Sequence, residues 1–194
     1  ILIIGDEVGT LLREALKYNS IQEAHHLPLY QEFSKILRTT KFSDDLNASA
    51  HKNSKVFLHE VSFYEFVSKQ QQTFDLVVFA PLVTDLNQIW PYFKDPLFFK
   101  RLSEWVTPKG ILIIKLADPY QNKEYKLYTK SLLSKLKGFQ VYPFLTHLIY
   151  SKDGVYFPAV LSLLITRNSI EIEKLKLNKD VSSKYLDNLS LLFD

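Results

Sequence analysis

Apolar runs alternate with amphipathic stretches along this chain, and the alternation begins at the first residue. Ile1–Ile4 has no polar interruption, which is typical of a parallel strand buried on both faces. Gly5 and Gly9 then bracket an acidic turn, and Thr10 is placed to cap an amphipathic helix. The first N–H groups of such a helix point at whatever binds over the turn. This layout predicts either a nucleotide-binding turn or a plain strand-to-helix connection, since both favour these residues.

Later segments predict further strands of the same sheet. Phe74–Ala80 and Ile111–Leu116 are apolar almost throughout, and a turn is expected at residues 108–110 before the second of them. Ile21–Leu29 and Lys55–His59 take the positions of the second and third strands, although two histidines and a proline weaken the first of these.

The remaining segments predict the helices and the end of the sheet. Helices are expected over residues 31–37, over 63–68 with Ser62 as the cap, over 97–106 and over 123–136, with a polar loop over 41–54. Val141–Tyr150 and Val155–Ile165 flank an Asp-Gly pair, which is typical of an antiparallel hairpin. The pattern therefore predicts an α/β fold, with a mostly parallel seven-stranded sheet and helices on both faces.

A length of 194 residues suits a single α/β domain. We expect residues 1–170 to form this domain and residues 171–194 to form a C-terminal tail or helix that packs on it or extends from it. The chain begins inside a predicted core strand and contains no methionine. It is therefore expected to be a piece of a longer protein, unless methionine positions are missing from the sequence.

Composition narrows the classes of partner. The chain is 46% hydrophobic and 23% charged, and no apolar run approaches the ~20 residues that cross a bilayer, so we expect a soluble, cytoplasmic segment without a membrane partner. A net charge of +3 from scattered lysines indicates no nucleic-acid partner. The absence of cysteine excludes a disulfide framework, a thiolate nucleophile and a cysteine-type zinc site.

Two longer motifs resemble those of a known family. GDEVGTLLREALKY, from Gly5 to Tyr18, resembles the spermidine synthase signature GGGDGGTLREVLKH. FFKRLSEWVTPKGILIIKLADP, from Phe98 to Pro119, resembles FYELLKRALKPGGILVLQGESP of the same family. The chain thus resembles a divergent member of the spermidine synthase (polyamine aminopropyltransferase) family. That resemblance implies a three-layer, Rossmann-like fold of the class I S-adenosylmethionine-dependent methyltransferase type.

The resemblance also implies a chemistry. An aminopropyltransferase lets a neutral amine attack a carbon next to a sulfonium, so it needs a proton acceptor, with carboxylates and aromatic faces around the cations. The implied ligand is S-adenosylmethionine, its decarboxylated form or methylthioadenosine, without a metal. The implied partner is a small polyamine substrate, and a homodimer is compatible with the family.

Carried over by position, the family's ligand contacts fall on seven residues. These are Gly5, Asp6, Glu7, Gly9 and Thr10 in the first turn, His25 at the ribose-binding position, and Ser62 near the adenine-binding position. A helix cap is the simpler role for Ser62. His25 replaces a carboxylate, and imidazole lacks the bidentate acceptor geometry of that group.

Two acids of the family pattern are missing near the reacting atoms. Val8 stands where the family has an amine-holding Asp, and Ala80 stands at the catalytic Asp. Asp85 is the only acid in the loop after the fourth strand, so it is the predicted catalytic residue. Each lost charge-assisted hydrogen bond is worth ~1.5–3 kcal/mol, which predicts a poor spermidine synthase.

Other side chains are predicted to be structural or to favour a different function. Core packing is favoured over a pocket wall for the aromatic residues Trp90, Tyr92 and Phe93, and no catalytic role is predicted for His51, His59 or His147. Lys115 resembles one member of the catalytic set of RNA 2′-O-methyltransferases. Three hypotheses therefore remain: an aminopropyltransferase-like enzyme, a catalytically inactive binding or structural module of the same fold, and an S-adenosylmethionine-dependent methyltransferase.

Overall fold

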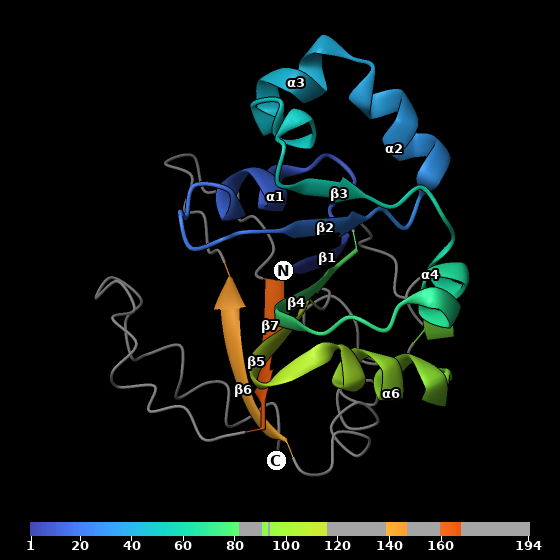
Figure 1. Ribbon diagram of the computed structural model, residues 1–194, viewed down its shortest axis with the longest axis vertical. Coiled ribbons are helices and arrows are strands. Elements are labelled where there is room, and N and C mark those ends of the chain that lie inside the picture. Colours follow the sequence, from blue (N-terminus) through green and yellow to red (C-terminus); the bar gives the residue numbers. More distant parts are fainter. Residues whose placement is uncertain (82–90, 93, 116–138, 147–159, 168–194) are drawn as a thin grey trace, which may run out of the picture.

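The computed structural model describes residues 1–81, 91–92, 94–115, 139–146 and 160–167 (Figure 1). Within them the strands are β1 (Leu2–Gly5), β2 (Ala24–Leu27), β3 (Val56–Leu58), β4 (Phe74–Ala80), β5 (Val106–Lys115), β6 (Gln140–Thr146) and β7 (Val160–Thr166). The helices are α1 (Thr10–Ala15), α2 (Gln31–Arg38), α3 (Lys41–Asn47), the 3₁₀ turn η1 (Ala50–Lys52), α4 (Phe63–Lys69) and α6 (Pro96–Trp105).

The strands form one sheet in the order β3-β2-β1-β4-β5-β7-β6. Strands β1 to β5 are parallel, and β7 runs antiparallel to both β5 and β6. This confirms the predicted α/β fold with a mostly parallel seven-stranded sheet and a closing antiparallel pair. The chain moves outward from β1 to β3 on one side and from β4 to β6 on the other, so the order reverses between β1 and β4 (Figure 1). Open α/β sheets bind ligands at the carboxyl ends of the strands at such a reversal.

One face of the sheet carries the larger part of the core. Leu2 and Ile4 of β1 point to this face, together with buried residues of β4, β5 and β7. Helices α4 and α6 cover it with aromatic side chains, among them Phe66, Phe98 and Trp105. Leu2 and Ile4 share this face because every second residue of a strand points the same way.

The opposite face packs against α1 and η1. Ile3 of β1, Ala24 of β2 and Leu12 of α1 form a small buried cluster there with Ala50 of η1. The two faces of β2 are therefore different environments. His25 pairs with Leu2 and belongs to the α4 face, whereas His26 pairs with Ile3 and belongs to the α1 face.

Two predicted local structures are wrong. Residues 41–54 were expected to be a polar loop but contain α3 and η1. Most of these residues are polar, so the sequence carries little helical hydrophobic pattern. Residues 108–110 were expected to be a turn but lie within β5. Phe74 pairs with Val106 and Leu76 with Ile111, so the intervening residues of β5 bulge out of the ladder, which accommodates a proline.

Several predictions fall outside the described residues. They are the helix over 123–136, the Asp-Gly turn at 153–154, the tail over 171–194, and the side chains of Asp85, Trp90, Phe93 and His147. No helix of the described part of the chain is long and apolar enough to cross a membrane.

Candidate ligand site

The turn after β1 is held tightly against the end of β4. Gly5 adopts φ +90°, and a Cβ atom there would lie 2.3 Å from the carbonyl oxygen of Ala80. The backbone N–H of Asp6 donates a hydrogen bond of 2.9 Å to that same oxygen. Only glycine allows both the backbone conformation and this close approach, so the two strand ends form a single edge.

Asp6 caps α1 in place of the predicted Thr10. Oδ1 of Asp6 accepts hydrogen bonds from the backbone N–H of Thr10 at 3.0 Å and from its hydroxyl at 3.1 Å, and Oδ2 accepts from the N–H of Leu12 at 3.0 Å. Gly9 is the N-cap residue and supplies no side-chain bond. The expectation that these N–H groups point at a ligand is therefore wrong for Thr10 and Leu12, because the chain's own carboxylate occupies the helix start.

Glu7 is a fully buried acid at the same edge. Its Oε1 accepts a hydrogen bond of 3.0 Å from the backbone N–H of Leu29, in the loop after β2. Its Oε2 is buried and has no hydrogen-bond partner among the described residues. Burial raises the pKa of Glu7, and burial also raises that of Asp6 against the opposing effect of its hydrogen bonds. Burial thus favours the neutral form of both acids, and a cation bound beside them would favour the charged form.

Tyr92 lies beside this edge but packs as a core residue. Its ring centroid is 5.2 Å from that of Phe63 and 6.2 Å from that of Phe79. Burial raises the pKa of the Tyr92 hydroxyl, with further contributions from Tyr30, Tyr64 and Glu7. The core-packing prediction is confirmed for this residue.

The other two predicted contacts lie away from the turn. His25 sits in the middle of β2, stacked on Phe57 at 4.9 Å and on His59 at 5.1 Å, on the α4 face. The structure therefore does not bring His25 to the carboxyl edge. The hydroxyl of Ser62 accepts a hydrogen bond of 3.2 Å from the N–H of Glu65, which confirms its role as the cap of α4.

Sequence reasoning missed two histidines that contact the turn. Nε2 of His26 lies 2.8 Å from the carbonyl oxygen of Gly5, and its Nδ1 lies 3.2 Å from Nε2 of His51. The only signal in the sequence was that His26 alternates with His25 along a strand. His51 gave none, because it falls in the segment predicted as a loop. No group of three metal-binding side chains occurs within the described residues.

A cavity of about 520 Å³ opens beside the turn on the α1 face. Its walls are mostly apolar and come from β1, β4, β5 and α1, with turn residues at one end and Lys115 and Ser162 along one side. Asp6, Glu7, Val8, Thr10 and Ala80 all line it. Three of the seven predicted ligand contacts thus line the cavity, whereas Gly5, Gly9, His25 and Ser62 do not. The lining also includes both positions at which the family acids are replaced by apolar side chains.

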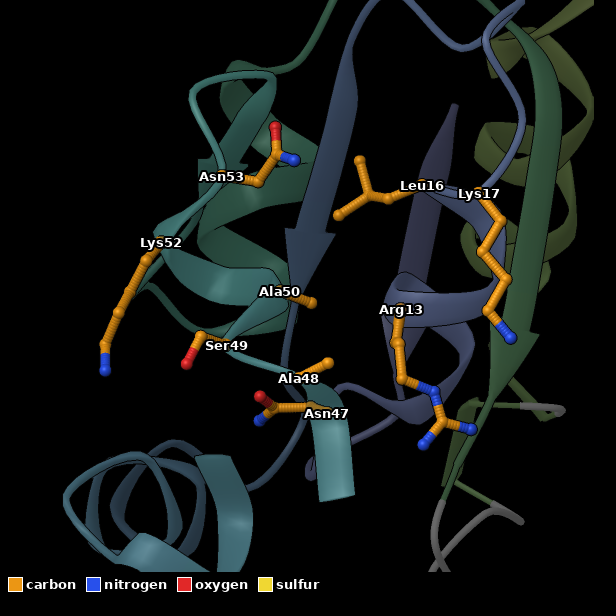
Figure 2. A pocket seen from close by; sticks show the side chains of 9 residues that line it. All are labelled: Arg13, Leu16, Lys17, Asn47, Ala48, Ser49, Ala50, Lys52 and Asn53. Carbon is orange, nitrogen blue, oxygen red and sulfur yellow. The ribbon is translucent and has the colours of Figure 1, made fainter. Parts of the chain in front are cut away.

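A second pocket of about 420 Å³ lies between α1 and residues 47–53 (Figure 2). Figure 2 shows Arg13 of α1 and Lys17, which follows that helix, on one side and Lys52 on the other. Each of these cations is already paired, the first two with Glu14 and Lys52 with Asp44. The pocket therefore offers no unpaired charge to a ligand.

The sheet order, the glycine turn at its reversal and the flanking cavity define a Rossmann-like α/β protein of the class I methyltransferase type. The family model described as the spermine/spermidine synthase domain matches residues 1–164. The chain belongs to this family, of which it is a divergent member.

Curated relatives and solved structures agree with this assignment. The chain is 26% identical over 138 residues to a polyamine aminopropyltransferase of Prochlorococcus marinus (strain MIT 9215), a match that covers 71% of this chain and 47% of the relative. A second strain, MIT 9301, gives the same identity and coverage. The chain thus spans about half the length of the curated relatives it matches.

Among solved structures, spermidine synthase from Thermotoga maritima superposes with a TM-score of 0.68 at 18% identity, covering 89% of this chain and 55% of that one. A spermidine synthase in complex with the transition state analogue AdoDATO gives a TM-score of 0.67 at 18% identity, covering 93% and 59%. A ribosomal protein L11 methylase from Lactobacillus delbrueckii subsp. bulgaricus gives 0.55 at 16% identity, covering 87% and 69%. At these identities the likeness concerns the fold.

Proposed function

We propose that this chain binds an S-adenosyl sulfonium compound at the carboxyl edge of β1 and β4 and transfers its aminopropyl group, inefficiently, to a polyamine. The observation that carries the proposal is the pair of buried acids, Asp6 and Glu7, that lines a cavity at the reversal of the sheet. The ligand classes follow from those of the relatives, which are named polyamine aminopropyltransferases and spermidine synthases.

The charges at the edge favour a cation without a carboxylate. Asp6 already places a negative group at the start of α1, so a ligand carboxylate there would meet a like charge. The buried Oε2 of Glu7 is an acceptor without a donor among the described residues. Decarboxylated S-adenosylmethionine carries a sulfonium and an amine and no carboxylate, so it matches both features better than S-adenosylmethionine does.

The transfer requires little beyond positioning and one proton acceptor. The nitrogen of the polyamine forms a bond to the aminopropyl carbon, the carbon–sulfur bond breaks, and its electron pair returns to sulfur, which leaves methylthioadenosine. The attacking nitrogen gives up one proton in this reaction. We propose that Asp85 accepts this proton, because Ala80 accepts no proton and Val8 binds no ammonium group.

The second candidate is a ligand-binding or structural module of the same fold without catalysis. It is favoured by the two apolar side chains, Val8 and Ala80, which line the cavity where family members carry acids. A calorimetric titration separates the two, using the full-length protein with S-adenosylmethionine, its decarboxylated form and methylthioadenosine. We expect the decarboxylated form to bind more tightly than S-adenosylmethionine, and tighter binding of S-adenosylmethionine would instead support a methyltransferase.

An aminopropyl-transfer assay with putrescine and with spermidine completes the test. A slow turnover supports the enzyme, and binding without any turnover supports the module. Rates typical of an efficient enzyme would refute the proposal of poor activity, and failure of all three compounds to bind would refute ligand binding at this edge.

A further inference from the structure

We propose that His26, His51 and Asn47 are positioning residues that hold the turn of residues 5–9 through a chain of hydrogen bonds available only to neutral imidazole rings. Their effect on ligand binding rests on the function proposed above, whereas their effect on the turn does not. The three residues come from β2, η1 and α3, and they reach both ends of the turn from one side.

The bonding pattern fixes the proton on each ring. The carbonyl oxygen of Gly5 only accepts, so Nε2 of His26, 2.8 Å away, is the donor. Nδ1 of the neutral His26 ring is then an acceptor, and the donor to it is Nε2 of His51 at 3.2 Å. Nδ1 of His51 is left as an acceptor, 3.4 Å from the side-chain nitrogen of Asn47.

Asn47 closes the chain at the other end of the turn. Its side-chain nitrogen donates a hydrogen bond of 2.8 Å to the carbonyl oxygen of Val8. One continuous series of bonds thus runs from the carbonyl of Gly5, through two histidines and an asparagine, to the carbonyl of Val8. The turn between these two carbonyls includes Asp6 and Glu7, the buried acids that line the cavity.

Packing reinforces these bonds. Gly9, the last residue of the turn, lies directly against the His51 ring, since a Cβ atom at Gly9 would be 2.6 Å from Cε1 of that ring and 2.8 Å from its Nε2. Figure 2 shows the segment that carries Asn47 and Ala50 facing α1 across the second pocket. The ring of His51 therefore reaches the turn from this segment, and any movement of η1 changes the support of Gly9.

The surroundings keep both rings neutral. Burial lowers the pKa of His26 and of His51 to about 4, and the guanidinium of Arg38 acts in the same direction at both rings. The His26 ring adds to this effect at His51, whereas hydrogen bonds to the backbone of Gly5 and Asp6 oppose it at His26. The ring of His59 lowers the pKa of His26 further. At His51 the carboxylates of Asp6 and Asp44 act in the opposite direction, and Asp44 is itself paired with Lys52. A proton added to Nδ1 of His26 would turn two donors toward each other and break the chain.

The protein carries a matched control on the other face of β2. Nδ1 of His25 lies 3.0 Å from Nε2 of His59, so this pair has the same geometry as His26 and His51. It packs on the α4 side, against Phe57 and Phe66, and takes no part in the series of hydrogen bonds that reaches the turn. Loss of His59 removes a histidine pair without touching residues 5–9.

The first experiment is ¹⁵N NMR of the histidine rings of the full-length protein without ligand. We expect His26 and His51 to carry the proton on Nε2 and to stay neutral down to about pH 5. A proton on Nδ1 of His26 at neutral pH would overturn the proposed chain, whatever the protein binds.

The second experiment compares His51→Ala, His51→Gln and His59→Ala. Amide hydrogen exchange should accelerate at Gly9 in His51→Ala, and affinity for methylthioadenosine should fall about fivefold to tenfold, as for one lost hydrogen bond. Gln places a donor near the position of Nε2, so His51→Gln should restore most of the exchange protection at Gly9 and most of the affinity. His59→Ala should change neither the exchange rate nor the affinity.

The outcomes separate the positioning role from the proposed function. Equal effects of His59→Ala and His51→Ala, or unchanged exchange at Gly9 in His51→Ala, would overturn the positioning role. If the wild-type protein binds no probe, the proposed function fails, while the exchange and NMR results still decide whether the histidines hold the turn.

Discussion

The carboxylate of Asp6 accepts a hydrogen bond from the backbone N–H of Leu12, six residues further along the chain and 3.0 Å away. Asp6 adopts φ 56°, in the left-handed region, and this conformation turns its side chain back over the start of α1. The first acid of the turn is therefore part of the scaffold, whereas Glu7, its neighbour, keeps one acceptor atom unused among the described residues. The two acids have different roles, and mutations should separate them.

For Asp6, we expect Asp6→Ala to lower the free energy of unfolding by about 1–2 kcal/mol, because the helix loses its cap and a non-glycine residue without a polar side chain must keep a positive φ. Asp6→Asn should lose less, since Asn tolerates this conformation and keeps one acceptor oxygen. Urea denaturation of both variants measures the difference. An equal loss in the two would contradict the capping role.

For Glu7, we expect Glu7→Gln to weaken binding of decarboxylated S-adenosylmethionine by roughly 10- to 100-fold, because a charge-assisted hydrogen bond contributes about 1.5–3 kcal/mol. Gln keeps an acceptor for the N–H of Leu29, so the fold should persist. Calorimetry gives the affinity, and methylthioadenosine, which carries no positive charge, serves as the control ligand. A similar loss for both ligands would argue against recognition of the cation.

Glu7 also predicts a pH dependence of stability. Burial raises its pKa above the usual 4.5, so its contribution to stability is fully present below pH 4.5 and is lost as the pH rises through the raised pKa. The stability of Glu7→Gln relative to wild type should therefore increase above pH 4.5. Unfolding measured from pH 4 to pH 8 tests this, and a constant difference would refute it.

For Asp85, we expect Asp85→Ala to reduce any aminopropyl transfer by ~10²- to 10⁴-fold, the usual effect of removing a general base. The unfolding midpoint should stay unchanged. The assay uses putrescine and spermidine with the full-length protein, and Asp75→Ala is a matched control because Asp75 pairs with the Thr107 hydroxyl at the opposite edge of the sheet. An undiminished rate in Asp85→Ala would remove this residue from the mechanism.

The buried histidines predict a loss of stability in acid. Both have a folded-state pKa of about 4 against 6.5 in the unfolded chain, so the unfolded state takes up protons first as the pH falls. The free energy of unfolding should decline between about pH 6.5 and pH 4. Below about pH 4 the two histidines should cause no further decline. At about 1.4 kcal/mol per pKa unit, each contributes at most about 3 kcal/mol, and less for the partly exposed His51. His51→Gln should flatten the decline, which thermal unfolding across this range measures.

Much of the fold could be predicted because it depends on patterns of neighbouring residues. Phe74–Ala80 forms β4 with the predicted bounds, and Ile1–Ile4 gives β1 with a shift of one residue, because a buried parallel strand needs an uninterrupted apolar run. Ser62 could be recognised as a cap for a similar reason, since its partner Glu65 is only three residues away. The two motifs that carry the family resemblance are likewise contiguous stretches.

The site depended on relationships between distant residues, and only the tertiary structure decided these. Glu7 is buried against Leu29, twenty-two residues away, and His26 meets His51 across twenty-five. Both contacts depend on the register of β1 against β2 and on the packing of η1, in a segment with too few apolar residues to predict even its helices. The sequence by itself determined the order of the strands, the helices other than α3 and η1, and the family, because those follow from neighbouring residues. Which acid caps the helix depends on the backbone angle at Asp6, and the burial of Glu7 depends on the position of the loop after β2. Both are set by packing across the sheet.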